Sequence, residues 1–167
     1  MTSIMGGQVE DEWQTAFPLL ARDYARHVQA ENETRAAAGR SALPLDETLT
    51  ESLEVSPRNL IQPTHWPNID LIGAQLNLYW AEFQVPVWRM QARSWPLWDA
   101  LANALQSDKI LEDYDIILLD TPPALGYLTI NALSAADILL VPLLSLIHIS
   151  EPTRPLYISY AVFCLKK

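Results

Sequence analysis

Asp120 is the residue of this chain best placed to do chemistry. It follows a run of four large aliphatic residues and precedes Thr121 and two prolines. A buried strand that ends in an acidic residue delivers it to the sheet edge, where open α/β sheets bind ligands. Beside a nucleotide, such a carboxylate would hold Mg²⁺ through water, because magnesium keeps most of its hydration shell. The pattern predicts Asp120 as a metal carboxylate, and an aspartate that merely ends a core strand is the alternative.

The elements around Asp120 predict a strand, a helix and a second strand. Residues 113–120 carry consecutive apolar side chains without alternation, which is typical of a strand covered on both faces of a parallel sheet. Residues 126–135 predict a helix, and residues 137–143 a second buried strand. This order and spacing describe a right-handed crossover unit. We therefore expect an α/β fold in which helices flank a parallel sheet.

The N-terminal half of the chain reads as mainly helical. Apolar residues recur with a helical period over residues 13–30, and residues 31–44 lose that period and predict a loop. Asp46 is placed to cap a short helix.

Four of the six tryptophans lie within residues 80–98. We predict that they pack in the core and at an interface, with Tyr79, Trp80 and Phe83 holding a short helix against the sheet. Base stacking on single strands is the alternative.

Composition limits the classes of function. The chain has 167 residues and a formal net charge of −9, which opposes a protein that wraps nucleic acid with its whole surface. The one cysteine, Cys164, cannot form an internal disulfide. The longest apolar run, residues 138–149, is shorter than the roughly 20 residues that span a bilayer. These features predict a cytoplasmic protein with no membrane partner.

Two segments carry a family resemblance. Residues 113–143, "DYDIILLDTPPALGYLTINALSAADILLVPL", resemble the Walker B region and following crossover of ParA-type ATPases, the deviant Walker A (Soj/MinD-like) group that segregates plasmids and chromosomes. Residues 60–83, "LIQPTHWPNIDLIGAQLNLYWAEF", are similar to the segment of those proteins that runs into the central strand. The resemblance covers roughly residues 1–143.

The resemblance implies a P-loop NTPase-type fold and a nucleotide site. The intact parent would bind ATP and Mg²⁺, dimerise across the nucleotide, associate with non-specific DNA, and hydrolyse ATP when a ParB-type centromere-binding protein stimulates it. Such a parent is cytoplasmic and associates with the nucleoid. Three residues of this chain match positions of the family's nucleotide site. The resemblance implies that Asp120 is the metal carboxylate and that Thr121 and Pro122 lie beside the cofactor. For Thr121, a role in stabilising the turn is the alternative.

Two other functions remain open beside the partitioning ATPase. One is another MinD-like ATPase, which would carry a C-terminal amphipathic helix for a membrane. The other is a replication or partition regulator that binds DNA or protein without catalysis. A lysine-bearing loop upstream would indicate an enzyme, and a degenerate loop would indicate the binding module.

The family's phosphate loop is absent from this sequence. The five glycines stand at positions 6, 7, 39, 73 and 126, and none is followed by lysine, whereas a phosphate cradle needs glycines next to a cationic side chain. The opening "MTSIMGGQ" resembles the segment that comes after the Asp-Pro-Gln switch motif in ParA proteins. We therefore expect the phosphate-loop unit and the catalytic switch aspartate to lie upstream of Met1. We expect no catalytic residue in this chain, and neither hydrolysis nor tight binding of ATP.

The sequence departs from the family after Leu143. Residues 144–154, "LSLIHISEPTR", and residues 158–167, "ISYAVFCLKK", look like translated sequencing adapter. We therefore divide the chain into residues 1–143, a partial ParA-like ATPase domain, and residues 144–167, an adapter-derived tail. The composition of "LIHIS" in this tail permits a strand, which would carry no function. A reading frame that is never expressed as such is a further alternative.

Overall fold

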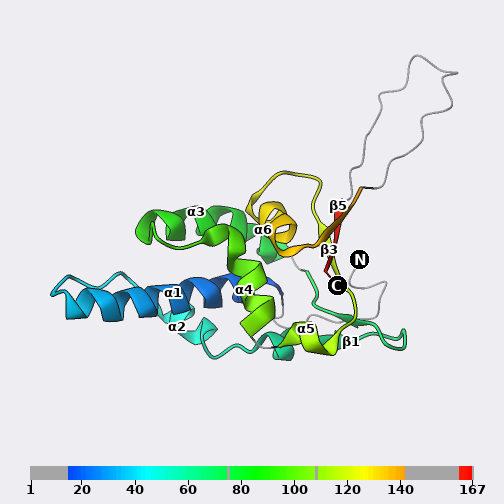
Figure 1. Ribbon diagram of the computed structural model, residues 1–167, viewed down its shortest axis with the longest axis horizontal. Helices are drawn as coiled ribbons and strands as arrows, with labels where there is room; N and C mark the ends of the chain where they lie inside the picture. Colours follow the sequence, from blue (N-terminus) through cyan, green and yellow to red (C-terminus); the bar gives the residue numbers. More distant parts are fainter. Residues whose placement is uncertain (1–14, 75, 108, 142–161, 167) are drawn as a thin grey trace, which may run out of the picture.

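The computed structural model describes residues 15–74, 76–107, 109–141 and 162–166. A body of helices lies on one side of the molecule, and a small sheet lies beside it (Figure 1). The α-helices are α1 (Phe17–Ala37), α2 (Glu47–Ser52), α3 (Ala81–Gln91), α4 (Ala100–Ser107), α5 (Ile110–Asp113) and α6 (Tyr127–Ala135). The 3₁₀ helices are η1 (Pro57–Leu60), η2 (Leu76–Trp80) and η3 (Leu97–Asp99). No helix in these described ranges is long and apolar enough to cross a membrane.

Helix α1 extends through residues 31–37, so the loop predicted there is wrong for those residues. Arg35 pairs with Glu31 one turn earlier at 3.4 Å, and the alanines that follow are strong helix formers. The helix ends at Ala37, and Gly39 just beyond it adopts a left-handed φ of 64°. The N–H of Arg40 then reaches back to the carbonyl of Arg35 at 2.8 Å, as in a glycine-terminated helix end.

The predicted cap of α2 is confirmed. The Asp46 carboxylate accepts a hydrogen bond from the N–H of Leu49 at 2.8 Å. This bond satisfies one of the donors that a helix leaves free in its first turn.

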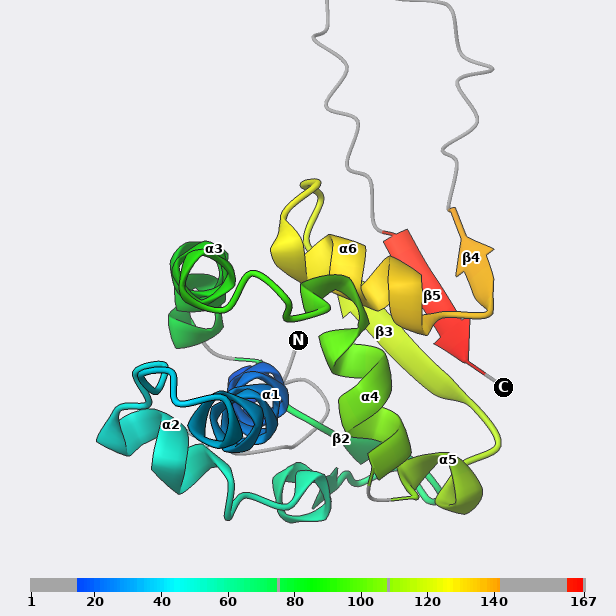
Figure 2. The same ribbon diagram turned by 60° about the vertical axis from the view of Figure 1, so that its left-hand side comes forward.

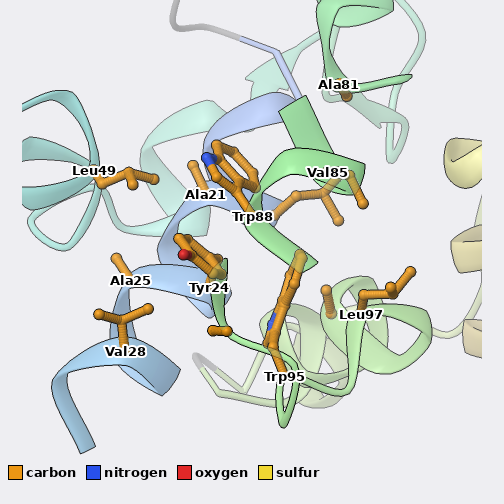
Figure 3. Close-up of a cluster of buried hydrophobic side chains, with 13 residues drawn as sticks. Ala21, Tyr24, Ala25, Val28, Leu49, Ala81, Val85, Trp88, Trp95 and Leu97 are labelled. Atoms are coloured by element: carbon orange, nitrogen blue, oxygen red, sulfur yellow. The ribbon is translucent and has the colours of Figure 1, made fainter. Parts of the chain in front are cut away.

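The core of the helical body is built on three aromatic rings (Figure 3). Tyr24 of α1 stacks on Trp88 of α3 with ring centroids 5.1 Å apart, and it meets the edge of Trp95 at 5.0 Å. The indole N–H of Trp95 donates to the Asp23 carboxylate at 2.8 Å. Burial raises the pKa of Asp23, and the Trp95 hydrogen bond opposes that rise.

The prediction that the tryptophans pack in the core is correct for Trp88 and Trp95, which are 6% and 1% exposed. Core packing is not found for Tyr79, Trp80 and Phe83, which are each more than half exposed. These three residues lie on η2 and on the face of α3 that points away from the core. They therefore do not hold a helix against the sheet.

The sheet keeps the predicted elements and changes their pairing. Strands β3 (Ile117–Thr121) and β4 (Ile138–Leu140) flank α6 in sequence, as expected. Strand β5 (Val162–Lys166) lies between them and pairs antiparallel with both, so β3 and β4 run in the same direction without being neighbours (Figure 2). The predicted parallel pairing is therefore not formed in the described sheet. The fold is a mixture of helices and strands. A separate antiparallel pair is formed by two strands of two residues each, β1 (Gln62–Pro63) and β2 (Asp70–Leu71).

Strands β3 and β4 are more exposed than their sequence predicts. Ile116 is 65% exposed, Leu118 is 53% exposed, and all three residues of β4 are about half exposed. Helix α6 packs against β3 and β5. Ile117 and Leu119, which alternate with Leu118, are half-buried. The prediction that both faces of this strand are covered is therefore wrong, because apolar side chains of one face remain in solvent.

The segment assigned to the adapter-derived tail falls largely outside the described residues. The boundary predicted near residue 143 and the "LIHIS" stretch both lie there. The described part of that segment is β5, which pairs through its backbone with β3 and β4.

Removing the Trp95 side chain should strongly destabilise the helical body. We expect Trp95→Ala to lower the free energy of unfolding by about 3–5 kcal/mol, because it leaves a cavity between α1 and α3 and removes the indole donor of the half-buried Asp23 carboxylate. Urea denaturation followed by far-ultraviolet circular dichroism measures this change. Trp66→Ala is the matched control, because Trp66 is 58% exposed. Equal losses in the two variants would contradict the assigned core.

Candidate functional site

Asp120 lies near the carboxyl end of β3, one residue before the strand ends. Its side chain is exposed, whereas the next residue, Thr121, is 8% exposed. Alternation along the strand places Asp120 on the same open face as Leu118. Pro122 follows in an exposed position at the start of the turn. The structure thus places the three predicted site residues at the sheet edge, with Asp120 open to solvent.

The turn after Asp120 is closed by the carbonyl of Pro122. That carbonyl accepts a hydrogen bond from the N–H of Ala124 at 2.8 Å and one from the Thr129 hydroxyl at 3.5 Å. Gly126 then precedes α6, and its carbonyl accepts the helical bond from Ile130 at 3.0 Å. The turn is therefore tied to the helix that follows it.

Glu82 of α3 caps the helix that comes after this turn, a role that the sequence pattern did not predict. Its two carboxylate oxygens accept hydrogen bonds from the backbone N–H groups of Tyr127 and Leu128, at 2.7 and 2.9 Å. These N–H groups belong to the first turn of α6, where a helix has unsatisfied donors and a partial positive charge. The cap comes from 45 and 46 residues away in sequence, so no local capping pattern announces it.

Gly126 makes room for this carboxylate. A Cβ atom at this position would lie 2.6 Å from both Cδ and Oε2 of Glu82. The backbone of Gly126 is extended, with φ −93° and ψ −178°, which any residue can adopt. An added Cβ would therefore displace the Glu82 carboxylate, which is the flexible end of its side chain, and would add no backbone strain.

The opposite side of α6 is fixed by η3 and α4. Tyr127 stacks on Trp98 with ring centroids 5.6 Å apart and an interplanar angle of 7°. Asn131, which is 1% exposed, donates to the carbonyl of Tyr127 at 3.0 Å and accepts from the N–H of Leu101 at 3.3 Å. The start of α6, and with it the turn after Asp120, is thus held from both sides.

A second polar contact supports the segment that enters β3. The hydroxyl of Tyr114 donates to the Asp70 carboxylate at 2.7 Å, and Asp113 forms an ion pair with Arg58. Burial, together with the hydrogen bond to Asp70, raises the pKa of Tyr114 to about 12. The contact joins β2 to the chain just before the strand that carries Asp120.

The donor set at Asp120 suits one kind of metal site. Within the part of the chain that the structure describes, no three His, Cys, Asp or Glu side chains gather as a ligand set. A single exposed carboxylate matches the needs of Mg²⁺, which binds through one or two protein oxygens, water and phosphate. It does not match a structural zinc or calcium site, which takes four or more protein ligands.

Comparison with known proteins places the chain in a family. Residues 27–149 match the model of a family described as an AAA domain. The chain therefore belongs to this AAA domain family, and its similarity is to ParA-type partitioning ATPases. No solved structure gives a significant match.

Three curated relatives show this similarity. The chain is 39% identical over 85 residues to "Sporulation initiation inhibitor protein Soj" of Bacillus subtilis, which is 50% of the chain and 30% of that protein. It is 37% identical over 86 residues to "Chromosome partitioning protein ParA" of Myxococcus xanthus, 52% of the chain and 28% of that protein. It is 35% identical over 85 residues to a "Putative replication protein A" of Sinorhizobium fredii, 49% of the chain and 20% of that protein. The matched segment thus spans less than a third of each relative.

The fit between Gly126 and Glu82 can be tested by a double-mutant cycle. We expect Gly126→Ala and Glu82→Ala each to lower the free energy of unfolding by about 0.5–2 kcal/mol, because either change removes the cap. The double variant should lose about as much as one single variant, because the new Cβ then meets no carboxylate. Urea denaturation of the four proteins measures the coupling.

The control pair for this cycle is Gly39→Ala with Glu82→Ala. Gly39 has a left-handed φ, and an added Cβ would have no atom within 4 Å. The stability lost in Gly39→Ala should therefore arise from the backbone, and it should add to the stability lost in Glu82→Ala. Additive losses in the Gly126 cycle would show that the carboxylate does not occupy the helix end.

Proposed function

We propose that this chain is part of a ParA-type ATPase for plasmid or chromosome partitioning, with Asp120 as its Mg²⁺ carboxylate. The observation that supports the proposal most is Asp120 at the carboxyl end of β3, followed by a turn and a capped helix, all inside the residues that match the family. Ligands of α/β proteins bind at this end of a strand. That the ligand is a nucleotide is inferred from the ParA-type resemblance of residues 113–143.

The residues of this chain would position the metal. In the parent, Mg²⁺ with ATP would supply charge neutralisation for phosphoryl transfer to water. Asp120 would hold a water of the Mg²⁺ shell, with its exposed carboxylate free to turn toward it. Thr121 and Pro122 would border the phosphates, and the Glu82 cap would keep their turn in place through the start of α6.

The parent protein would supply the remaining groups. Phosphoryl transfer is mostly positioning and charge neutralisation, so the phosphate loop and the switch aspartate must be present together with Asp120. In this proposal they lie outside residues 1–143, and residues 144–167 are not part of the domain. The exposed apolar side chains of β3 and β4 and the short match to each relative support a partial domain.

The parent's partners are proposed from the same family. We propose a homodimer that forms across ATP, binds non-specific DNA, and is stimulated by a ParB-type centromere-binding protein in the cytoplasm, at the nucleoid. The name of one relative, "Chromosome partitioning protein ParA", supports partitioning as the process in which the parent acts. The acidic charge of the chain means that DNA contacts would come from a local basic patch of the parent.

A non-catalytic replication or partition regulator is the second candidate. A degenerate phosphate loop upstream of Met1 would favour it over the enzyme, because a phosphate cradle needs glycines next to a cationic side chain. The similarity to a "Putative replication protein A" is compatible with it.

The purified chain should not hydrolyse ATP. We expect no Mg²⁺-dependent release of phosphate above the rate without protein, because one carboxylate cannot replace the cradle of N–H groups and lysine. A coupled phosphate assay with and without EDTA measures this. Turnover that depends on magnesium and is lost in Asp120→Asn would overturn the proposed partial site.

The two candidate functions, enzyme and regulator, predict different phosphate-loop sequences upstream of Met1. Sequencing the genomic DNA across both ends of the reading frame should reveal an upstream glycine-lysine loop and a different continuation after Leu143. In the longer protein, Asp120→Asn should lower ATP turnover by on the order of 10²-fold, while Asp115→Asn, an exposed carboxylate before β3, should leave it unchanged. A degenerate loop, or a longer wild-type protein without ATP turnover, would favour the regulator. Turnover that is unchanged in Asp120→Asn would contradict the role of Asp120.

A further inference from the structure

The Asp23 carboxylate on α1 is half-buried beside the aromatic core, and it takes no part in the proposed nucleotide site. Trp95, whose indole N–H donates to this carboxylate at 2.8 Å, is 1% exposed, and the neighbouring Tyr24 is fully buried. Among the described residues, no cationic side chain forms an ion pair with Asp23. An ionised carboxylate in this place loses hydration without gaining a cation in contact with it. Asp23 should therefore take up a proton more readily in the folded chain than in the unfolded chain.

The groups around Asp23 act on its charge in two opposite directions. Burial raises the pKa of Asp23 above its ordinary value of 3.8, and this is the largest influence. The Trp95 hydrogen bond opposes the rise, as do the Asn103 side chain of α4 and the charges of His27 and Arg26 on α1 itself. Because the pKa is raised in the folded state, the stabilising contribution of Asp23 is fully present below the pKa of the unfolded chain. It is lost as the pH rises through the folded pKa.

Trp95 belongs to the connection between α3 and α4, which spans residues 92–99 and consists of tight turns. The N–H of Trp95 donates to the carbonyl of Ala92 at 3.1 Å. The N–H of Asp99 donates to the carbonyl of Pro96 at 3.0 Å, and the proline ring restricts the backbone between these two turns. A short segment with internal hydrogen bonds and a buried ring moves largely as one unit. A shift of Trp95 therefore displaces the end of the connection as well.

The end of this connection contacts α6. Trp98 stacks on Tyr127 in the first turn of α6, and the Asp99 carboxylate accepts a hydrogen bond from the Ser134 hydroxyl at 3.0 Å. Helix α1 packs against α4, while η3 and α4 pack against α6. The α3–α4 connection thus joins the surroundings of Asp23 to the helix that follows the turn after Asp120.

A second contact between α1 and the connection responds to acid in the opposite sense. The Ser94 hydroxyl donates to the Glu31 carboxylate, and the Nε2 atom of His27 lies 2.9 Å from the Ser94 oxygen. The Ser94 hydrogen bond lowers the pKa of Glu31, so this contact is lost only as the pH falls below the ordinary glutamate value of 4.5. Imidazole groups in general titrate between about pH 5 and pH 8, so a test must separate His27 from Asp23.

We propose that Asp23 is a pH-responsive contact that sets how firmly the α3–α4 connection, and through it the start of α6, is held on α1. Protonated Asp23 keeps an oxygen for the Trp95 N–H and buries no charge. Ionised Asp23 favours positions nearer to water, which loosens Trp95 and the connection. This conformational device goes beyond the proposed function and requires no nucleotide.

Nuclear magnetic resonance titration of the wild-type chain, from about pH 7.5 to about pH 4, tests the proposal through the Trp95 indole N–H. We expect this signal to titrate with a midpoint above 3.8, and we expect the Ile130 N–H, whose acceptor is the Gly126 carbonyl, to follow with the same midpoint. Asp23→Asn should abolish both responses, because an amide keeps the acceptor oxygen and takes up no proton in this range. His27→Gln should retain them. Far-ultraviolet circular dichroism confirms that both variants are folded.

Urea denaturation provides a second readout with a matched control. The unfolding constant of the wild-type chain, divided by that of Asp23→Asn, should increase at least about two-fold between about pH 4 and about pH 7, because only the wild type buries a charge as the pH rises. Glu33→Gln removes an exposed carboxylate from the same helix, and the corresponding ratio for this variant should stay constant. A ratio for Asp23→Asn that stays constant or decreases would contradict the proposal.

Three results of the titration would overturn the proposal. The first is a Trp95 indole signal that does not change above pH 3.8. The second is a response that survives in Asp23→Asn and is lost in His27→Gln, which would assign it to the imidazole. The third is a response at Trp95 without one at Ile130, which would show that the connection does not transmit it. Because no nucleotide is present, failure here leaves the assignment of Asp120 unaffected.

Discussion

The position of the candidate site depends on one carboxylate, that of Glu82, at the start of α6. The helical body has its own aromatic core, whereas β3 and β4, the strands whose burial is described, bury few of their side chains, so specific contacts are needed to hold them against the body. Glu82 provides such a contact, because its oxygens bind the N–H groups of Tyr127 and Leu128 while the rest of α3 remains packed on α1. An anionic group at a helix N-terminus is stabilised by both the free donors and the helix dipole. The turn that carries Pro122 is therefore fixed between β3 and a helix whose first turn cannot move freely.

The same arrangement explains why the molecule is unevenly packed. Tyr24, Trp88 and Trp95 bury the inner faces of α1 and α3. Asn131 ties α6 to α4 by accepting a hydrogen bond from the N–H of Leu101, while its amide N–H donates to the Tyr127 carbonyl within α6. Beyond α6, apolar residues of β3 and β4 remain in solvent, although a run such as theirs is normally covered on both faces in α/β proteins. Two exposed apolar surfaces result, one on the sheet and one along α3. An isolated surface of this kind marks an interaction site or the contact of a larger fold.

The sequence predicts the local elements of this fold better than their assembly. Residues 117–121, 127–135 and 138–140 form the predicted strand, helix and strand, because their apolar runs and turn residues act locally. The pairing of the strands was not predictable, since β5 comes from a segment that the family resemblance does not cover. Helix α1 continued past its apolar period because alanines and a Glu31–Arg35 pair need no core contact to favour a helix. Of the site, Asp120 could be singled out from its place after a strand, whereas Glu82 could not, because its partners lie on another helix.

Amide hydrogen exchange at the start of α6 tests the central claim most directly. If Glu82 holds this helix end, the N–H groups of Tyr127 and Leu128 should exchange slowly in the wild-type chain and at least about ten-fold faster in Glu82→Ala, since their acceptor is lost. The N–H of Ile130, which is bonded to the carbonyl of Gly126, is the internal reference, because its acceptor is retained. Equal exchange of the Tyr127 and Leu128 amides in the two proteins would contradict the account.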